Sequence, residues 1–540
     1  MRPRAAKKTF ASSPSEHFGG SRLPGAVRTV ALGVQHLFAM FGATMLVAVL
    51  TGLSPSATLL WAGTGTIVFH LVTRLRVPAF LGSPFAFIPG YAAMTALCGK
   101  PGFENLTVGA ALQYACLGVA AGSLLYFAVA AFVKVCGVKR VVTLFPPVVT
   151  GPIIICIGLV LAPVALNSCM FGRFSGGADY DACMAAMTAA GGSASLNWCV
   201  ALAGIVTVIG VSVFARGMLR VVPVLSGVAV SYLTAYLLGN VLGRGVPIDY
   251  GRVAAAAWAG LPVAAGNTVF PVLRNIDWGA AATAFAVIMP LSFAAVMEHV
   301  GDVSAISSIV GRNFFADPGL HRTLSGDGLA TFLASLFGAP ANTTCGENTG
   351  VLSITGVHDP RVIRVAAVIA VFISFCPKFT AFIDTVPAET IGGVSFVLYG
   401  MIASAGARNL VEGRVDFSKG RNMLIAAVIL VLALGVSFSK AGSIRFSVAG
   451  VNVALSGLAA GAMAGILLNA LLPGKDFVSS ETAPSIKDPD RFGAPKAASA
   501  PAAGIDLTAK NGKLDGVRAK AARPGDGRNR GSRKKRRRKG

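Results

Sequence analysis

Long apolar runs recur along this chain of 540 residues, and the polar residues between them do not alternate with a period of two. About 20 apolar residues cross the hydrocarbon core of a bilayer. Because lipid offers no hydrogen-bond partner to backbone N–H and C=O groups, runs of this length must fold as helices. The pattern therefore predicts an all-α integral membrane protein. The clearest runs cover residues 29–53, 57–72, 108–133, 141–161, 221–242 and 451–472.

Shorter or interrupted apolar segments raise the expected number of membrane segments to about fourteen. They lie at residues 80–97, 199–215, 280–298, 329–338, 348–355, 362–375, 389–403 and 423–436. The first run follows a basic and polar stretch without a convincing small-residue cleavage site, so we interpret it as a span and not as a signal peptide.

Basic residues gather in alternate loops, beginning with residues 2–8. Because positive charge marks the cytoplasmic side, the protein is expected to cross the cell inner membrane many times with both termini in the cytoplasm. The insert at residues 167–197 would then lie outside the cytoplasm, where Cys169 and Cys183 are either a disulfide or two free thiols. The basic loops contain Arg74 and Arg76; Lys134, Lys139 and Arg140; Arg216 and Arg220; Arg312 and Arg322; Arg361 and Arg364; and Lys419 and Arg421.

Composition supports the membrane class, since only 13% of the residues are charged, against roughly a quarter in soluble proteins. Residues 25–472 form the expected membrane domain, after a basic cytoplasmic segment at 1–24 and before a tail at 473–540 that is expected to be disordered.

Residues 475–540 hold 18 basic and 7 acidic residues, and thus 11 of the 24 net positive charges. The high charge therefore does not predict nucleic-acid binding. The tail either contacts anionic lipid headgroups or is solvated without a partner.

Two short apolar segments are broken by Gly or Pro at corresponding places in the two halves of the chain. One holds the sequence Leu-Gly-Ser-Pro-Phe-Ala-Phe at residues 81–87, and the other extends from Gly338 to Asn348. Paired interruptions of this kind predict a transporter built from inverted repeats, with its site near the membrane midplane.

Glu298 ends an apolar segment and is followed by His299 and Asp302. Because a carboxylate at the centre of a span costs about 2.5 to 3.5 kcal/mol, it normally faces a cavity or a partner. Glu298 and Asp302 are four residues apart and share one helix face, whereas His299 is rotated by about 100°. The pattern indicates a substrate and proton site, with a water-exposed helix end as the alternative.

Glu347 lies in a segment whose Asn, Thr and Gly residues interrupt helix, so it can offer a carboxylate beside free backbone N–H groups. A flat base that carries N–H and C=O groups needs this mixture, although an ordinary polar loop is the alternative. Phe85 could contact such a ring or belong to the core, and His36 could line a cavity or bond between helices.

No P-loop, catalytic triad or metal motif is visible, so the sequence predicts neither an enzyme nor a cofactor or metal.

Several motifs resemble the nucleobase/ascorbate transporter family, particularly its uracil permease branch, over residues 25–472. They are Gln-His-Leu-Phe-Ala-Met-Phe-Gly-Ala-Thr at 35–44, residues 80–87, Glu-His-Val-Gly-Asp at 298–302, Asn-Thr-Thr-Cys-Gly-Glu-Asn-Thr-Gly at 342–350, and Gly-Gly-Val at 392–394.

This resemblance implies fourteen segments in two inverted repeats of seven. Segments one to four and eight to eleven would form a core domain, and the others a gate domain. The third and tenth segments would each contain a short strand, with substrate between them and beside the eighth helix.

The same resemblance implies proton-coupled uptake of uracil by a dimeric symporter embedded in the lipid bilayer. Glu298 and Glu347 would hold the base, and Phe85 and Gly346 would offer main-chain contacts beside Cys345. Glu298, Asp302 and His299 would couple protons, while Ala43, Asn348 and His36 would line the cavity.

Two residues depart from the uracil branch, where His is usual at the position of Asp302 and Tyr or Phe at that of Cys345. Asp302 resembles the residue found at this position in the purine and xanthine branch, whereas Glu347 resembles the residue found in the uracil branch. A purine or xanthine carrier, an anion transporter of the sulfate-permease type and a non-transporting membrane sensor therefore remain the alternatives.

Overall fold

A computed structural model describes residues 25–100, 102–137, 146–175, 179–217, 219–448 and 451–474. The expected basic segment at 1–24, the loop with Lys139 and Arg140, and the tail from 475 onward lie outside the described residues.

Eight helices in this described part are long and apolar enough to cross a membrane, and a pair bent by 90° at a short break raises the number to nine. Many apolar helices of spanning length identify a multi-pass membrane protein. Every expected segment overlaps a described helix, but several of these helices are too short to span alone, so the fourteen-segment inverted repeat stays a prediction. The bent pair is α15 (Pro360–Ser374) with α16 (Pro377–Ile383). The eight are α1 (Ala26–Thr51), α4 (Val108–Cys136), α6 (Pro147–Phe171), α8 (Ala194–Phe214), α9 (Pro223–Tyr236) with the π-helical turn Leu237–Val241 that continues it, α12 (Trp278–Val310), α17 (Ala388–Glu412) and α18 (Gly420–Ser437).

Side-chain caps and glycines set the ends of several helices. The Thr107 hydroxyl accepts a hydrogen bond from Ala110 N at the start of α4, and Asp277 accepts from Gly279 N and Ala280 N at the start of α12. Gly311 ends α12 in the left-handed conformation, with φ 71°, which glycine adopts without steric cost.

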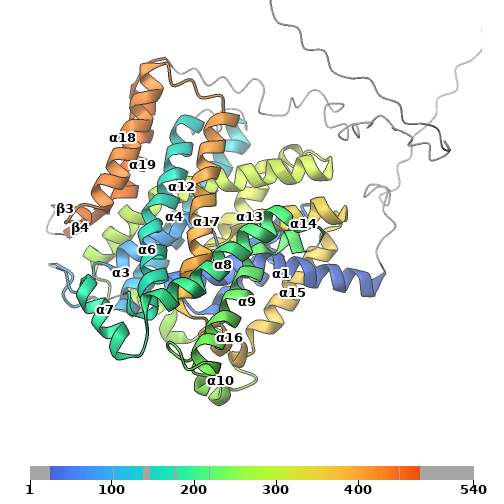
Figure 1. Ribbon diagram of the computed structural model, residues 1–540. Coiled ribbons are helices and arrows are strands. Elements are labelled where there is room, and N and C mark those ends of the chain that lie inside the picture. Colours follow the sequence, from blue (N-terminus) through green and yellow to red (C-terminus); the bar gives the residue numbers. More distant parts are fainter. Residues whose placement is uncertain are drawn as a thin grey trace, which may run out of the picture. The chain divides into compact units, whose positions relative to one another are not determined.

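The helices pack mainly within two groups, and Figure 1 labels most of their members. In the first, α4 contacts α12 and α13 (Leu320–Leu336), and α15 contacts α1 and α2 (Pro55–Val72). In the second, α17 contacts α6 and α8, and α18 lies beside α19 (Gly457–Leu471). The division into core and gate domains stays a prediction, because the described residues cluster as one compact unit.

An antiparallel hairpin corrects the expectation of an all-α chain. Strands β3 (Ser443–Val448) and β4 (Val451–Ser456) pair along their full length, from Ser443 with Ser456 to Val448 with Val451. The run at residues 451–472 is therefore not one helical span: it begins as β4 and turns helical at Gly457, where Ser456 caps α19 by accepting from Ala459 N. Alternating side chains and β-branched residues favour a strand here, whereas apolar content alone does not separate strand from helix.

The two cysteines of the insert are free thiols. Cys169 is buried near the end of α6, and Cys183 is buried in the short helix α7 (Tyr180–Ala189). The structure therefore corresponds to the free-thiol alternative and not to the disulfide.

Candidate functional site

The two broken segments meet in a two-stranded antiparallel ladder. Strand β1 (Leu81–Gly82) pairs with β2 (Thr343–Thr344), Leu81 opposite Thr344 and Gly82 opposite Thr343. Cys345 N donates a further hydrogen bond to Phe80 O over 2.9 Å. The expectation of a short strand in each broken segment is confirmed, and the two strands are direct partners.

Prolines favour an extended chain here, because they remove backbone donors and oppose helix: Pro78 and Pro84 flank β1, and Pro340 precedes β2. Backbone groups at this depth still need partners. Leu81 N donates to Thr66 Oγ1 over 2.9 Å, and the Thr331 hydroxyl donates to Asn342 O. Hydroxyls from neighbouring helices thus complete the short ladder.

A helical segment begins directly after each strand, so two helix N-termini lie beside the ladder. The 3₁₀ turn Phe85–Phe87 leads into α3 (Ile88–Thr95), and α14 (Gly346–Thr355) starts two residues after Thr344. Helix α12 contacts both β2 and α14. Unpaired N–H groups at helix N-termini carry a partial positive charge and bind acceptor groups.

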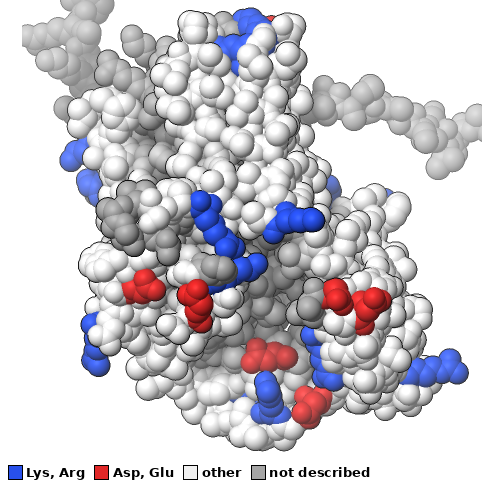
Figure 2. All heavy atoms as spheres, turned by 90° about the vertical axis from the view of Figure 1, so that its left-hand side faces the viewer, with Lys and Arg blue, Asp and Glu red and all other residues white. Residues whose placement is uncertain are grey.

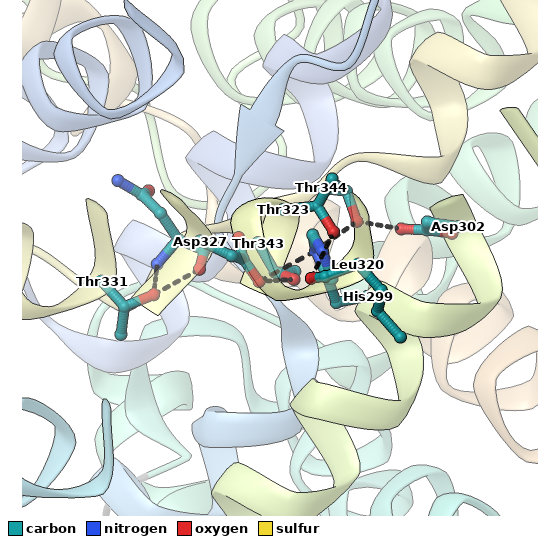
Figure 3. A network of polar contacts seen from close by, with 9 residues as sticks. His299, Asp302, Leu320, Thr323, Asp327, Thr331, Thr343 and Thr344 are labelled. Carbon is teal, nitrogen blue, oxygen red and sulfur yellow. Dashed lines mark hydrogen bonds and ion pairs between the residues drawn. The ribbon is translucent and has the colours of Figure 1, made fainter. Parts of the chain in front are cut away.

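A fully buried ion pair lies beneath β2 (Figure 3). His299 Nδ1 is 3.1 Å from Asp327 Oδ2, and both side chains have 0% exposure. The Thr343 hydroxyl donates to the same carboxylate oxygen over 2.9 Å. Asp327 therefore connects α12 and α13 to the strand.

Asp327 is a residue that the sequence analysis missed, because the expected segment began at residue 329, after the acid. Glycines on either side let α13 approach its neighbours closely. A Cβ on Gly326 would lie 3.3 Å from Phe69 Cα, and one on Gly328 would lie 2.6 Å from Tyr126 Cβ. The signal available in the sequence was a lone acid between two glycines at the start of an apolar stretch.

A second acid contacts the next strand residue. The Thr344 hydroxyl donates to Asp302 Oδ2 over 2.9 Å, and it lies 3.4 Å from His299 Nδ1. A Cβ on Gly346 would be 3.6 Å from Asp302 Oδ1. Asp302 and the exposed backbone of Gly346 are thus brought together at the start of α14.

Glu347 and Glu298 complete a group of four acids. Glu347 is half-buried in the first turn of α14 and accepts a hydrogen bond from the Cys345 thiol, with Sγ 3.0 Å from Oε2. Glu298 is exposed, whereas His299 is fully buried, so these adjacent side chains lie on different sides of α12. Glu298 forms no hydrogen bond with another described residue, and it interacts electrostatically with the other three acids, Asp302, Asp327 and Glu347.

The remaining predicted residues lie around this group without joining the network. Phe85 is half-buried at the start of the 3₁₀ turn, and Ala43 is buried in α1. His36 and Asn348 are buried, and His36 Nδ1 and both amide atoms of Asn348 lack a hydrogen-bond partner among the described residues. Asn348 therefore has polar atoms free to bind a ligand group.

The arrangement can bind a small polar molecule and exchange protons. It offers carboxylate acceptors, backbone donors and a thiol within a few residues of a paired ladder. No Lys or Arg takes part in the described hydrogen bonds of this group. Within the described ranges, no three His, Cys, Asp or Glu residues are placed to hold a metal ion.

Sequence comparisons match most of the chain. The profile of a family described as the permease family matches residues 27–442. A uracil permease of Bacillus caldolyticus is 41% identical over 448 residues, which cover 83% of this chain and 92% of that protein. A uracil permease of Bacillus subtilis (strain 168) is 37% identical over 86% of this chain and 96% of that protein. A putative pyrimidine permease, RutG of Escherichia coli (strain K12), is 38% identical over 84% of this chain and 91% of that protein.

Solved structures share the fold at low sequence identity. The transmembrane domain of the cyanobacterial bicarbonate transporter BicA aligns with a TM-score of 0.54 and 15% identity over 82% of this chain and 96% of that domain. The anion transporter family member SLC26A9 aligns with a TM-score of 0.55 and 12% identity, over 82% of this chain and 64% of that one. These likenesses concern the fold alone.

Proposed function

The chain belongs to the permease family, and from that membership we propose that it transports a nucleobase, with uracil as its substrate. The single observation that carries the proposal is the position of Glu347, in the first turn of the helix that begins at the paired strands. The relatives named as uracil or pyrimidine permeases support the same substrate class.

A uracil ring presents N–H donors and carbonyl acceptors in one plane, and the site offers a complement for each. The carboxylates of Glu347 and Glu298 accept from ring N–H groups. The backbone N–H groups around Gly346 and Phe85 donate to ring carbonyls. Because Cys345 donates to Glu347 Oε2 over 3.0 Å, the thiol fixes the carboxylate and leaves Oε1 for the substrate.

Uptake is coupled to protons in this proposal. Four carboxylates lie around one site with His299 as the nearest basic side chain. Carboxylates that face one another repel when all are ionised, and a substrate that covers the exposed Glu298 and the half-buried Glu347 would remove water from them. Binding of the base therefore favours the uptake of a proton by this group. Glu298, Asp302 and His299 carry this role, and Asp327 positions His299.

Transport follows alternating access, in which a core group of helices moves against a gate group. The protein would work as a homodimer in the inner membrane with both termini in the cytoplasm. The packing of α4 against α12 and α13, and of α17 against α6 and α8, supports such a rigid-body motion.

The test is uptake of radiolabelled uracil by cells that lack their own uracil carrier and express this chain. We expect uptake that a protonophore abolishes and that excess xanthine does not reduce. Inhibition of uracil uptake by xanthine would indicate a purine carrier instead. Binding of uracil without uptake would indicate a membrane sensor.

Glu347→Gln tests the role of the carboxylate. The substitution replaces an acceptor oxygen by an NH₂ donor, which would face the N–H donor of the uracil ring. We therefore expect the affinity for uracil to fall by at least tenfold. Glu104→Gln is the control, since Glu104 is exposed and bonds only locally to Gly102 N. Unchanged uracil affinity in Glu347→Gln would remove the residue from the site.

A further inference from the structure

A pocket of about 80 Å³ lies away from the acidic site, between the end of α3, helix α12 and the β3–β4 hairpin. Leu97 and Val287 supply apolar walls, while Ala454 and Ser443 line it from the hairpin side. Two basic residues, Lys100 and Arg445, complete the lining, which contains no Asp or Glu.

The hairpin register accounts for the position of Arg445. Arg445 is paired with Ala454, so both side chains lie on one face of the ladder, and both line the pocket. The residues on either side of Arg445 belong to the other face by the alternation of a strand. These neighbours, Ile444 and Phe446, are 41% and 45% exposed.

Lys100 reaches the pocket from the turn that follows α3. Its backbone N–H donates to Leu97 O over 3.0 Å, which places the lysine one turn beyond Leu97. Ala93 of α3 and the two residues directly after this helix, Ala96 and Leu97, line the same pocket as Lys100.

The two cations have no acidic partner. Neither Lys100 nor Arg445 forms an ion pair with another described residue, and the single described side-chain bond of Arg445 is Nε to Ser443 Oγ, 3.4 Å. Figure 2 shows several Lys and Arg side chains close together in the middle of the face toward which the hairpin lies. Two like charges beside one pocket repel each other, and an anion between them relieves that repulsion.

We propose that this pocket binds the phosphate group of an anionic lipid. Lys100 and Arg445 hold the phosphate, Ser443 donates a hydroxyl, and the apolar walls that Leu97 and Val287 supply contact the first part of the acyl region. Lipid is favoured over a free phosphate ion, because the chain is a multi-pass membrane protein and the pocket combines cations with apolar surface. The bound lipid would bridge α12, which carries Glu298, and the hairpin that leads into α19.

The experiment titrates purified full-length protein in detergent with phosphatidylglycerol and follows the midpoint of thermal unfolding. Phosphatidylcholine and inorganic phosphate are titrated in parallel. We expect phosphatidylglycerol to raise the midpoint in a saturable manner and the other two to have little effect. Equal stabilisation by phosphatidylcholine, or by inorganic phosphate alone, would overturn the proposal of an anionic lipid.

The double variant Lys100→Gln with Arg445→Gln locates the site. We expect its apparent Kd for phosphatidylglycerol to rise at least tenfold. Lys440→Gln is the matched control, since Lys440 lies next to the hairpin and does not line the pocket, and it should keep the wild-type Kd. The charge-conserving variant Lys100→Arg should bind like wild type, which separates lost charge from misfolding. Unchanged affinity in the double variant would contradict the proposal, and this readout is independent of uracil uptake.

Discussion

Replacing Asp327 by Asn is expected to weaken uracil binding although the residue does not face the proposed base. The carboxylate lies 3.1 Å from His299 Nδ1 and accepts a hydrogen bond from Thr343 Oγ1 at 2.9 Å, in a fully buried setting. Asn keeps the shape and one acceptor oxygen but removes the charge. Hydrogen bonds to charged groups contribute about 1.5–3 kcal/mol each. Asp327 holds β2 and α12 in position for uracil, so the free energy of one lost bond is expected to appear in the binding free energy. This corresponds to about a tenfold to hundredfold loss of uracil affinity.

The assay is calorimetric titration of purified protein with uracil, together with the midpoint of thermal unfolding. Asp327→Asn should lower both the affinity and the midpoint, and Asp327→Ala should lower them further because two buried donors are left without an acceptor. Asp384→Asn is the control, an acid that is exposed at the end of α16. Uracil affinity within threefold of wild type in Asp327→Asn, with a folded protein, would refute the positioning role.

Two further predictions concern the paired strands. Gly82→Ala should reduce uracil binding by at least tenfold, because the added Cβ would lie 2.7 Å from Thr44 Oγ1. Gly350→Ala is the control and should bind uracil normally, since its added Cβ would have no atom within 4 Å. Equal binding by the two variants would argue against tight packing at the ladder. Thr344→Val should keep the fold but lower uptake about threefold to tenfold through loss of the bond to Asp302, about 1 kcal/mol, and it should shift the pH profile of uptake. An unchanged profile would separate Asp302 from proton coupling.

The membrane class was predictable because it rests on a local signal; the candidate site residues also rest on local signals, and they stay predictions. Apolar length identifies the spans, and a carboxylate beside a helix break identifies Glu347. Glu298, His299 and Asp302 were found because three polar residues at the end of an apolar run stand out. Their roles remain predictions.

The parts that were missed depend on tertiary contacts or on a mixed signal. Asp327 precedes the apolar run that starts at residue 329 and was therefore assigned outside the membrane segment, although two flanking glycines allow it to be buried between helices. Strand β4 was assigned to a helix because its single polar residues, Asn452 and Ser456, were treated as minor interruptions of an apolar run that continues into α19. The pairing of Leu81 with Thr344 joins segments far apart in the chain, and no local pattern specifies such a partner.

The short ladder of β1 and β2 also bears on how the site can diverge in evolution. Its hydrogen bonds are made by the main chain, which every amino acid except proline supplies equally. Most substitutions in these strands therefore leave the ladder itself intact and change only what surrounds it, as long as no added atom enters the tight space at Gly82. The main-chain pairing can therefore be retained while neighbouring residues such as Cys345 and Asp302 differ between related proteins.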